Sequence, residues 1–250
     1  MKITVFIAAH KPYQFADDPM YMPLQVGRAL HEPFGISGDD TGDNISEKNA
    51  NYCELTGLYW AWKNIDADYV GLCHYRRYFA GKNCGDKWER ILTCEQAEKL
   101  LQDADVVLPR KRSYYIETNY SQYIHAHHKE DLDTTRKIIE EKFPEYLEAF
   151  DAHMNERKTH IFNMFIMRKD ILGNYCEWLF GVLSELEKRL DISDYSINDK
   201  RVFGFVSERL LDVWLNKNGI AYIEVPVVSM EKQNWIVKGG RFVMRKMGIR

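Results

Sequence analysis

Four residues that could bind an anion, His74-Tyr75-Arg76-Arg77, stand directly after the apolar run of residues 69–73. The run is typical of a buried strand. In an open α/β sheet, ligands bind beyond the carboxyl ends of the strands, and arginines bind phosphate oxygens through paired hydrogen bonds. The segment therefore predicts an anion pocket. A solvated basic turn after an edge strand is the alternative for the same pattern.

Two other strand-like runs also end in basic residues. Residues 105–109 are followed by Arg110, Lys111 and Arg112, and we expect this strand to neighbour the one that ends at His74. Residues 3–8 form an apolar run that stops at His10. This histidine could orient a nucleotide phosphate or simply end the first strand.

Two Asp-x-Asp patterns raise the question of a divalent metal, because paired carboxylates can hold such an ion against phosphates. They are Asp66-Ala67-Asp68 and Asp103-Ala104-Asp105. Both precede their predicted strands, which would place them at the wrong end of the sheet. We interpret them as helix-stop and strand-entry residues and assign no metal ligand. The sequence has no correctly placed Asp-x-Asp, and it leaves both a site with a Mn²⁺ or Mg²⁺ cofactor and a metal-independent site as interpretations.

A histidine cluster offers a second possible metal site. His125, His127 and His128 are close to Asp131, and imidazoles near a carboxylate are common metal ligands. On a helix, however, only His125 with His128, or His127 with Asp131, share a face. A metal site, a polar helix that contacts substrate and a solvated surface are the three interpretations.

Glu208 is the one carboxylate that we propose as a general base. It lies between the apolar residues 203–206 and 210–211, where partial burial would raise its pKa toward working pH. An ion pair with Arg209, or with an arginine of the anion pocket, is the alternative role.

The elements that position these residues alternate between strands and helices. We expect strands at residues 3–8, 69–73, 105–109, 161–167 and 221–225, and helices at residues 46–64, 94–103, 132–150 with an interruption at Pro144, 170–190 and 202–215. Residues 13–44 are expected to form a long ordered loop. The alternation indicates the α/β class, with a mostly parallel central sheet flanked by helices.

Composition limits the possible functions. The chain has 250 residues, of which 45% are hydrophobic and 28% charged, so it can form a sizeable core. The net charge of -3 provides no global basic field for nucleic acid. The five cysteines are dispersed and suggest reduced thiols. Without an apolar run of about 20 residues, we expect a cytoplasmic protein.

The last residues differ from the rest in charge. Residues 232–250 combine six lysines and arginines with apolar side chains such as Trp235 and Phe242. We expect a domain at residues 1–230 and a basic amphipathic tail at residues 231–250. Such a tail could bind the inner face of the cell membrane, or it could pack one face on the domain.

Longer motifs resemble a known family, the bacterial capsular and exopolysaccharide glycosyltransferases gathered under domain of unknown function 4422. The motifs cover residues 39–49, 52–56, 59–64, 71–79, 160–167 and 201–208. The resemblance implies a single GT-A-like (Rossmann-like) glycosyltransferase domain. Some members of the family are assigned galactofuranosyl transfer from a UDP-linked sugar.

The resemblance also implies roles for individual residues. Glu208 becomes the catalytic base. The expected donor-binding residues are His10, Lys11, Asp43, Asn44, Asn51, Tyr52, Glu54, His74, Tyr75, Arg76 and Arg77. The expected acceptor-binding residues are Tyr120, His125, His128, His160 and Asn163.

The function expected from the sequence is therefore inverting sugar transfer from a UDP-sugar, with galactofuranose or galactose as the sugar. The acceptor would be a lipid-linked or oligosaccharide glycan of capsular polysaccharide, exopolysaccharide or lipopolysaccharide synthesis. A non-catalytic module that binds a nucleotide-sugar or a glycan is the alternative.

Overall fold

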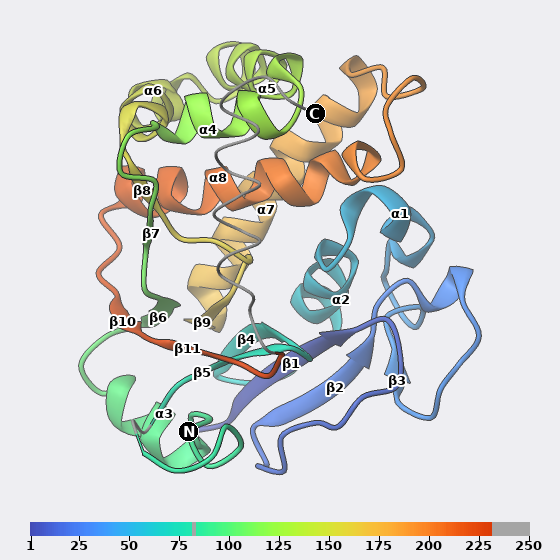
Figure 1. Ribbon diagram of the computed structural model, residues 1–250, viewed down its shortest axis with the longest axis vertical. Coiled ribbons are helices and arrows are strands. Elements are labelled where there is room, and N and C mark those ends of the chain that lie inside the picture. Colours follow the sequence, from blue (N-terminus) through green and yellow to red (C-terminus); the bar gives the residue numbers. More distant parts are fainter. Residues whose placement is uncertain (82–83, 232–250) are drawn as a thin grey trace.

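One sheet runs through the centre of the structure, a computed structural model that describes residues 1–81 and 84–231 (Figure 1). Its strands follow the spatial order β10-β6-β9-β4-β1-β2-β3, and β5 pairs with both β4 and β11. The strands are β1 (Ile3–Ala9), β2 (Tyr21–Gln25), β3 (Ser37–Gly38), β4 (Tyr69–His74), β5 (Arg77–Phe79), β6 (Val106–Pro109), β9 (Phe165–Arg168), β10 (Ile223–Val225) and β11 (Val227–Ser229). A separate ribbon joins β7 (Arg112–Ser113) to β8 (Lys158–Thr159).

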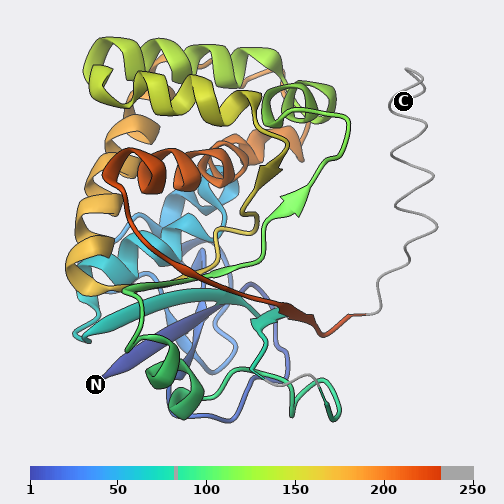
Figure 2. The same cartoon turned by 90° about the vertical axis from the view of Figure 1, so that its left-hand side faces the viewer.

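Most helices lie on one side of this sheet (Figures 1 and 2). They are α1 (Asn49–Tyr52), α2 (Leu55–Asn64), α4 (Asn119–Ala126), α5 (Lys129–Lys142), α6 (Leu147–Asn155), α7 (Lys169–Arg189) and α8 (Val202–Asn218). The helix α3 (Cys94–Leu100) lies on the other side. Short 3-10 turns are η1 (Arg28–Leu30), η2 (Ser46–Lys48), η3 (Pro144–Tyr146) and η4 (Asp199–Arg201).

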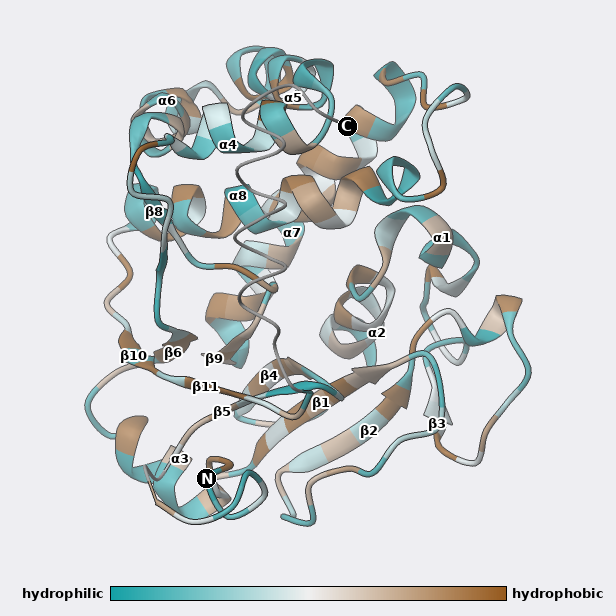
Figure 3. Ribbon diagram, viewed as in Figure 1, coloured by the Kyte–Doolittle hydropathy of each residue, from teal (hydrophilic) through white to brown (hydrophobic). Residues whose placement is uncertain are grey.

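Alternating side chains of the central strands fill two cores. In β1, Phe6 and Ala8 pack with the helices α2, α7 and α8, whereas Val5 and Ile7 pack with α3 and β5. This alternation follows from the two-residue period of a strand, and it explains why the strand is apolar throughout. Figure 3 shows the contrast between the largely hydrophobic β1 and the largely hydrophilic α5.

Local signals set several helix ends. The side chain of Thr93 begins α3 by accepting a hydrogen bond from the backbone N–H of Gln96, which satisfies a free donor of the first turn. The last turn of α8 ends at Gly219, whose φ of 62° lies in the left-handed region that glycine adopts without strain. The predicted interruption at Pro144 separates α5 from α6.

The position of β9 corrects one expectation from the sequence. The strands that end at His74 and Pro109 are not neighbours, because β9 lies between them and is antiparallel to both β4 and β6. The pairs β1–β2, β1–β4, β2–β3 and β6–β10 are parallel. β9 comes later in the chain than β4 and β6, and its position between them does not change the sequence pattern of either strand. The order of the strands along the chain could therefore not reveal this arrangement.

The expected loop at residues 13–44 is also corrected. It contains β2, which pairs in parallel with β1 over five residues, and the short β3. Pro23 stands in the middle of β2, and proline normally argues against a strand because it lacks an N–H donor. The proline therefore concealed this strand in the sequence.

A third correction concerns the helix expected at residues 46–64. The chain divides into η2, α1 and α2, and Cys53 separates the two α-helices with a φ of 52°. The amide of Asn49 holds this break by donating to the carbonyl oxygen of Cys53 at 2.7 Å and to the hydroxyl of Thr56 at 3.0 Å. The strained residue faces the candidate site described below.

The expected basic tail at residues 231–250 lies outside the described residues, except for Glu231. Within the described chain, no helix is both long enough and apolar enough to cross a membrane.

Candidate functional site

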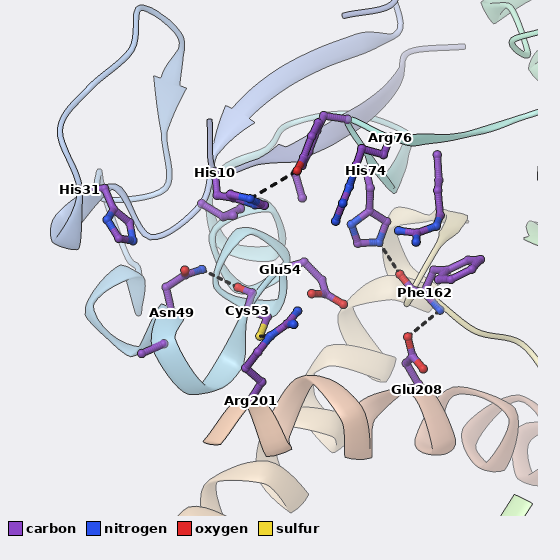
Figure 4. A pocket seen from close by; sticks show the side chains of 15 residues that line it. His10, His31, Asn49, Cys53, Glu54, His74, Arg76, Phe162, Arg201 and Glu208 are labelled. Atoms are coloured by element: carbon purple, nitrogen blue, oxygen red, sulfur yellow. Dashed lines mark hydrogen bonds between the residues drawn. The ribbon is translucent and has the colours of Figure 1, made fainter. Parts of the chain in front are cut away.

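A cavity of about 710 Å³ lies at the carboxyl ends of β1 and β4. These strands are adjacent and parallel, so that Ala8 is in register with His74. Its lining residues come from β1, β4, β5, α1, η4 and α8, from the break at Cys53 and from connecting segments (Figure 4): Ala8, His10, Val26, His31, Asn49, Ala50, Cys53, Glu54, His74, Tyr75, Arg76, Arg77, Phe162, Arg201 and Glu208.

Three arginines give the cavity its positive charge. The guanidinium of Arg77 lies 4.3 Å from the ring centroid of Phe162, and that of Arg76 lies 5.0 Å from the ring centroid of Tyr75. The Nε atoms of both arginines are buried and have no hydrogen-bond partner within the described residues. The third, Arg201, donates from Nε to the sulfur of Cys53 at 3.2 Å. Such guanidinium groups can receive phosphate oxygens.

His10 lies beside this positive group but is held neutral. Burial lowers its pKa, and the charges of Arg76 and Lys11 lower the pKa further. Its Nε2 lies 3.3 Å from the hydroxyl of Tyr75. His10 can therefore exchange hydrogen bonds with a ligand without adding a full charge.

Two carboxylates, those of Glu54 and Glu208, line the same cavity as the arginines. One oxygen of Glu208 accepts a hydrogen bond from the backbone N–H of Phe162 at 2.9 Å, and the other lies 3.8 Å from Nη1 of Arg209. Burial raises the pKa of Glu208, and the nearby charge of Glu54 adds to this shift, whereas Arg209 opposes it. Glu54 itself accepts from the amide of Asn163 at 2.8 Å.

A strained turn connects these groups. Phe162 and Asn163 have φ values of 76° and 54°, a left-handed conformation that costs energy for residues other than glycine. Asn163 is buried, and its side chain also bonds to Ser207 and to the backbone of Gly204 in α8. The surrounding contacts therefore fix a turn that would otherwise be unfavourable.

His74 also stabilises the turn at Phe162 and Asn163. Its Nε2 lies 2.6 Å from the carbonyl oxygen of Phe162, and since a carbonyl can only accept, we assign the proton to Nε2. Burial is the largest influence that lowers the pKa of His74. The neutral ring thus positions the turn, and its Nδ1 is left as an acceptor. This role differs from the cationic phosphate contact that a basic strand end suggests.

The structure does not bring all expected donor-binding residues to the cavity. His10, Glu54, His74, Tyr75, Arg76 and Arg77 line it, whereas Lys11, Asp43, Asn44, Asn51 and Tyr52 do not. The side chains of the last four have other partners: Asp43 accepts from Tyr59, Asn44 donates to the carbonyl of Gly42, Asn51 donates to the carbonyl of Lys200, and Tyr52 bonds to Glu187. The expected donor contacts of these four residues stay a prediction without geometric support.

The expected acceptor-binding residues are scattered, and none lines the cavity. Tyr120 donates to Asp133, His125 bonds to Glu117, and His128 stacks on Tyr195. His160 is buried between Asp212 and Glu224, at 2.7 and 2.9 Å. Asn163 alone among them contacts a lining side chain, that of Glu54.

The candidate metal ligands do not converge either. Within residues 1–81 and 84–231, no group of three or more histidine, cysteine, aspartate and glutamate side chains could hold a metal ion. Asp131 accepts from Tyr123 and Tyr195, while His127 and His128 face Asp199. The two Asp-x-Asp patterns lie at the opposite ends of β4 and β6 from the cavity.

Sequence reasoning missed several residues that line the cavity, among them His31, Asn49, Cys53 and Arg201. Arg201 left a usable signal, because it lies seven positions before Glu208, which is two turns along one face of a helix. The other three are placed by the break at Cys53 and by the chain around η1, and no pattern in the sequence marks them.

Comparison with known proteins gives two findings. The family described as "Domain of unknown function (DUF4422)" matches residues 4–219. A solved apo structure of the bifunctional glycosyltransferase WbbM is similar to this chain, with a TM-score of 0.87 and 33% sequence identity. The similarity covers 93% of this chain and 46% of the WbbM chain, so the present chain spans less than half of that protein. None of the curated proteins matches.

These findings confirm the α/β class and the GT-A-like arrangement expected from the sequence, with one domain built on a central sheet flanked by helices. They also confirm the family expected from the motifs, since the match extends over most of the chain. The protein belongs to the family of domain of unknown function 4422.

Proposed function

We propose that this protein is a glycosyltransferase that moves a hexosyl group from a UDP-sugar to a hydroxyl group of a glycan. The observation that carries the proposal is one cavity that is lined by three arginines and by the partly buried carboxylate of Glu208. The similarity to WbbM supports the reaction class. Galactofuranose or galactose is the proposed sugar, and synthesis of capsular polysaccharide, exopolysaccharide or lipopolysaccharide is the proposed context.

The arginines define the proposed donor side. Arg76 and Arg77 would bind the diphosphate of the UDP-sugar, because their buried Nε atoms have no other hydrogen-bond partner in the described chain. Arg201, the last residue of η4 directly before α8, also lines the cavity and would bind the same group. Fixed positive charge at this position stabilises the leaving UDP as its bond to the sugar breaks.

Glu208 defines the proposed acceptor side. The acceptor hydroxyl gives its proton to the carboxylate, and its oxygen attacks the anomeric carbon as the electron pair of the breaking bond moves to the diphosphate. This single displacement inverts the anomeric centre. The raised pKa of Glu208 makes it a stronger base than an ordinary glutamate.

The residues of the cavity do not fit a divalent metal. Its two carboxylates are bound to the amide of Asn163 and the backbone N–H of Phe162, and no cluster of three ligands exists in the described part of the chain. The arginines would supply the positive charge instead. We therefore expect transfer to continue in EDTA.

Incubation of the protein with a panel of UDP-sugars, with and without a glycan acceptor and EDTA, tests the proposal. We expect release of UDP together with a glycosylated product whose anomeric configuration is determined by NMR. Glu208→Gln serves as the control with strongly reduced activity. Binding of a UDP-sugar without turnover of any donor would favour the alternative, a non-catalytic binding module.

A further inference from the structure

A surface turn after β7 presents two apolar side chains to solvent. Tyr115 is 80% exposed and Ile116 is 58% exposed, although residues of these types usually bury most of their surface. They are adjacent in the chain, so their exposed surfaces form one projection. Exposed apolar groups of this kind often mark an interaction site.

The turn is held in a fixed conformation. The N–H of Ile116 donates to the carbonyl of Tyr114 at 2.7 Å, and the carbonyl of Tyr115 accepts from Nη1 of Arg157 at 3.2 Å. Tyr114 is buried beneath the turn, where its hydroxyl accepts from Arg209 at 3.2 Å. The anchored Tyr114 thus directs the next two side chains outward, and the left-handed φ of Tyr115, 57°, is maintained at some cost.

Cationic side chains surround this projection. Arg112 in β7 is paired across the ribbon with Thr159, and Lys158 in β8 is paired with Ser113. Arg112, Arg157 and Lys158 are all exposed, and none forms an ion pair with another described residue. The neighbouring Glu156 is directed toward His153, at 3.2 Å. The surface formed by residues 112, 115, 116, 157 and 158 is therefore apolar at its tip and positively charged around it.

We propose that this surface docks on an anionic lipid bilayer. Tyrosine and isoleucine can enter the interfacial layer, while arginine and lysine attract anionic headgroups. The charge of the surface favours this partner over a neutral glycan, which offers no charge to bind. Figure 2 shows that the ribbon of β7 and the end of β11 lie on the same side of the molecule, and β11 pairs with β5 at Arg77 of the cavity. The proposal does not depend on the proposed transferase activity.

Co-sedimentation of the full chain with vesicles tests the proposal. One set of vesicles contains phosphatidylcholine alone, and the other adds about one third phosphatidylglycerol. We expect binding to the anionic set only, about tenfold weaker binding for Tyr115→Ser with Ile116→Ser, and a similar loss for Arg112→Glu with Lys158→Glu. Ile197→Ser is the matched control, because Ile197 is 92% exposed on another loop, and this variant should bind like the original protein.

All these variants retain residues 232–250, so a difference between them isolates the surface described here. Equal binding of all variants, or no preference for anionic vesicles, would overturn the proposal. Unchanged vesicle binding together with weaker binding of an acceptor glycan by the Tyr115→Ser and Ile116→Ser variant would assign the surface to glycan instead. Circular dichroism spectra check that each variant is folded.

Discussion

The carboxylate of Glu208 is subject to two opposing influences. Burial and the charge of Glu54 raise its pKa, whereas Arg209 and the backbone N–H of Phe162 favour the charged form. The carboxylate is therefore more basic than that of a solvated glutamate. This balance suits a residue that must accept a proton from a hydroxyl group.

Replacing Glu208 with glutamine tests that role. Glutamine keeps the size of the side chain but cannot accept a proton, so we expect kcat to fall by roughly 10²- to 10⁴-fold. In the original protein, kcat/KM should fall as the pH is lowered through the raised pKa of Glu208, because the base becomes protonated. A pH–rate profile measures this acid limb, which should vanish in the residual activity of Glu208→Gln. An unchanged kcat would remove Glu208 from the mechanism.

Asn163 has two separable properties, its left-handed backbone and its buried amide. Asn163→Gly removes the amide but relieves the backbone strain, whereas Asn163→Ala removes the amide and retains the strain. Loss of the buried hydrogen bonds should lower the free energy of unfolding by about 1–3 kcal/mol in both variants. The alanine variant should lose about 1 kcal/mol more than the glycine variant.

Urea unfolding of the two variants measures this difference. Equal stability would mean that the left-handed conformation at residue 163 stores no strain. In both variants Glu54 loses the amide that holds it, so we also expect a lower kcat/KM even where the protein is fully folded.

At the scale of the elements, the end of β11 meets the cavity. Ser229 is paired with Arg77, the N–H of Met230 donates to the carbonyl of Arg76, and the carboxylate of Glu231 lies 3.3 Å from Nη1 of Arg76. Glu231 therefore occupies a position from which it would compete with the phosphate of a donor. Both side chains of this ion pair are partly solvated, so its contribution is small.

Glu231→Gln removes this competing charge while keeping the length of the side chain. We expect the KM for the UDP-sugar to fall by up to about fivefold, with kcat little changed, because an exposed ion pair contributes at most about 1 kcal/mol. Glu185→Gln, on the exposed side of α7, serves as the control. Glu224→Gln is unsuitable as a control, because Glu224 bonds to the buried His160. A higher KM would show instead that Glu231 orients Arg76 for the donor.

The elements that the sequence predicted well are those with long, uniform patterns. The apolar run of β1 and the helix that carries Glu208 were expected within a few residues of their observed bounds. β2 was missed because of Pro23, and the helix expected at residues 46–64 was too long because nothing in its pattern marks the left-handed Cys53. β2 depends on its pairing with β1, and the break at Cys53 depends on side-chain hydrogen bonds of Asn49, so helix and strand propensities could not reveal either feature.

At the scale of the molecule, the site was predicted in part. A basic strand end and a partly buried glutamate were identified more than 130 positions apart, and the fold brings both to one cavity. The expected acceptor contacts on α4 and at His160 do not line this cavity. The sequence could not reveal this, because a motif shows which residues recur together but not the direction of their side chains. His160, for example, is buried against Asp212 and Glu224.

Our main proposal is that Arg76 and Arg77, where the chain turns from β4 into β5, bind the diphosphate of a sugar donor and stabilise its departure. The most direct test is the rate of sugar transfer by Arg76→Ala with Arg77→Ala, compared with the original protein at saturating acceptor. We predict a loss of kcat/KM of at least 10²-fold, weaker binding of UDP by calorimetry, and an unchanged circular dichroism spectrum. Transfer and UDP binding close to those of the original protein would contradict the account.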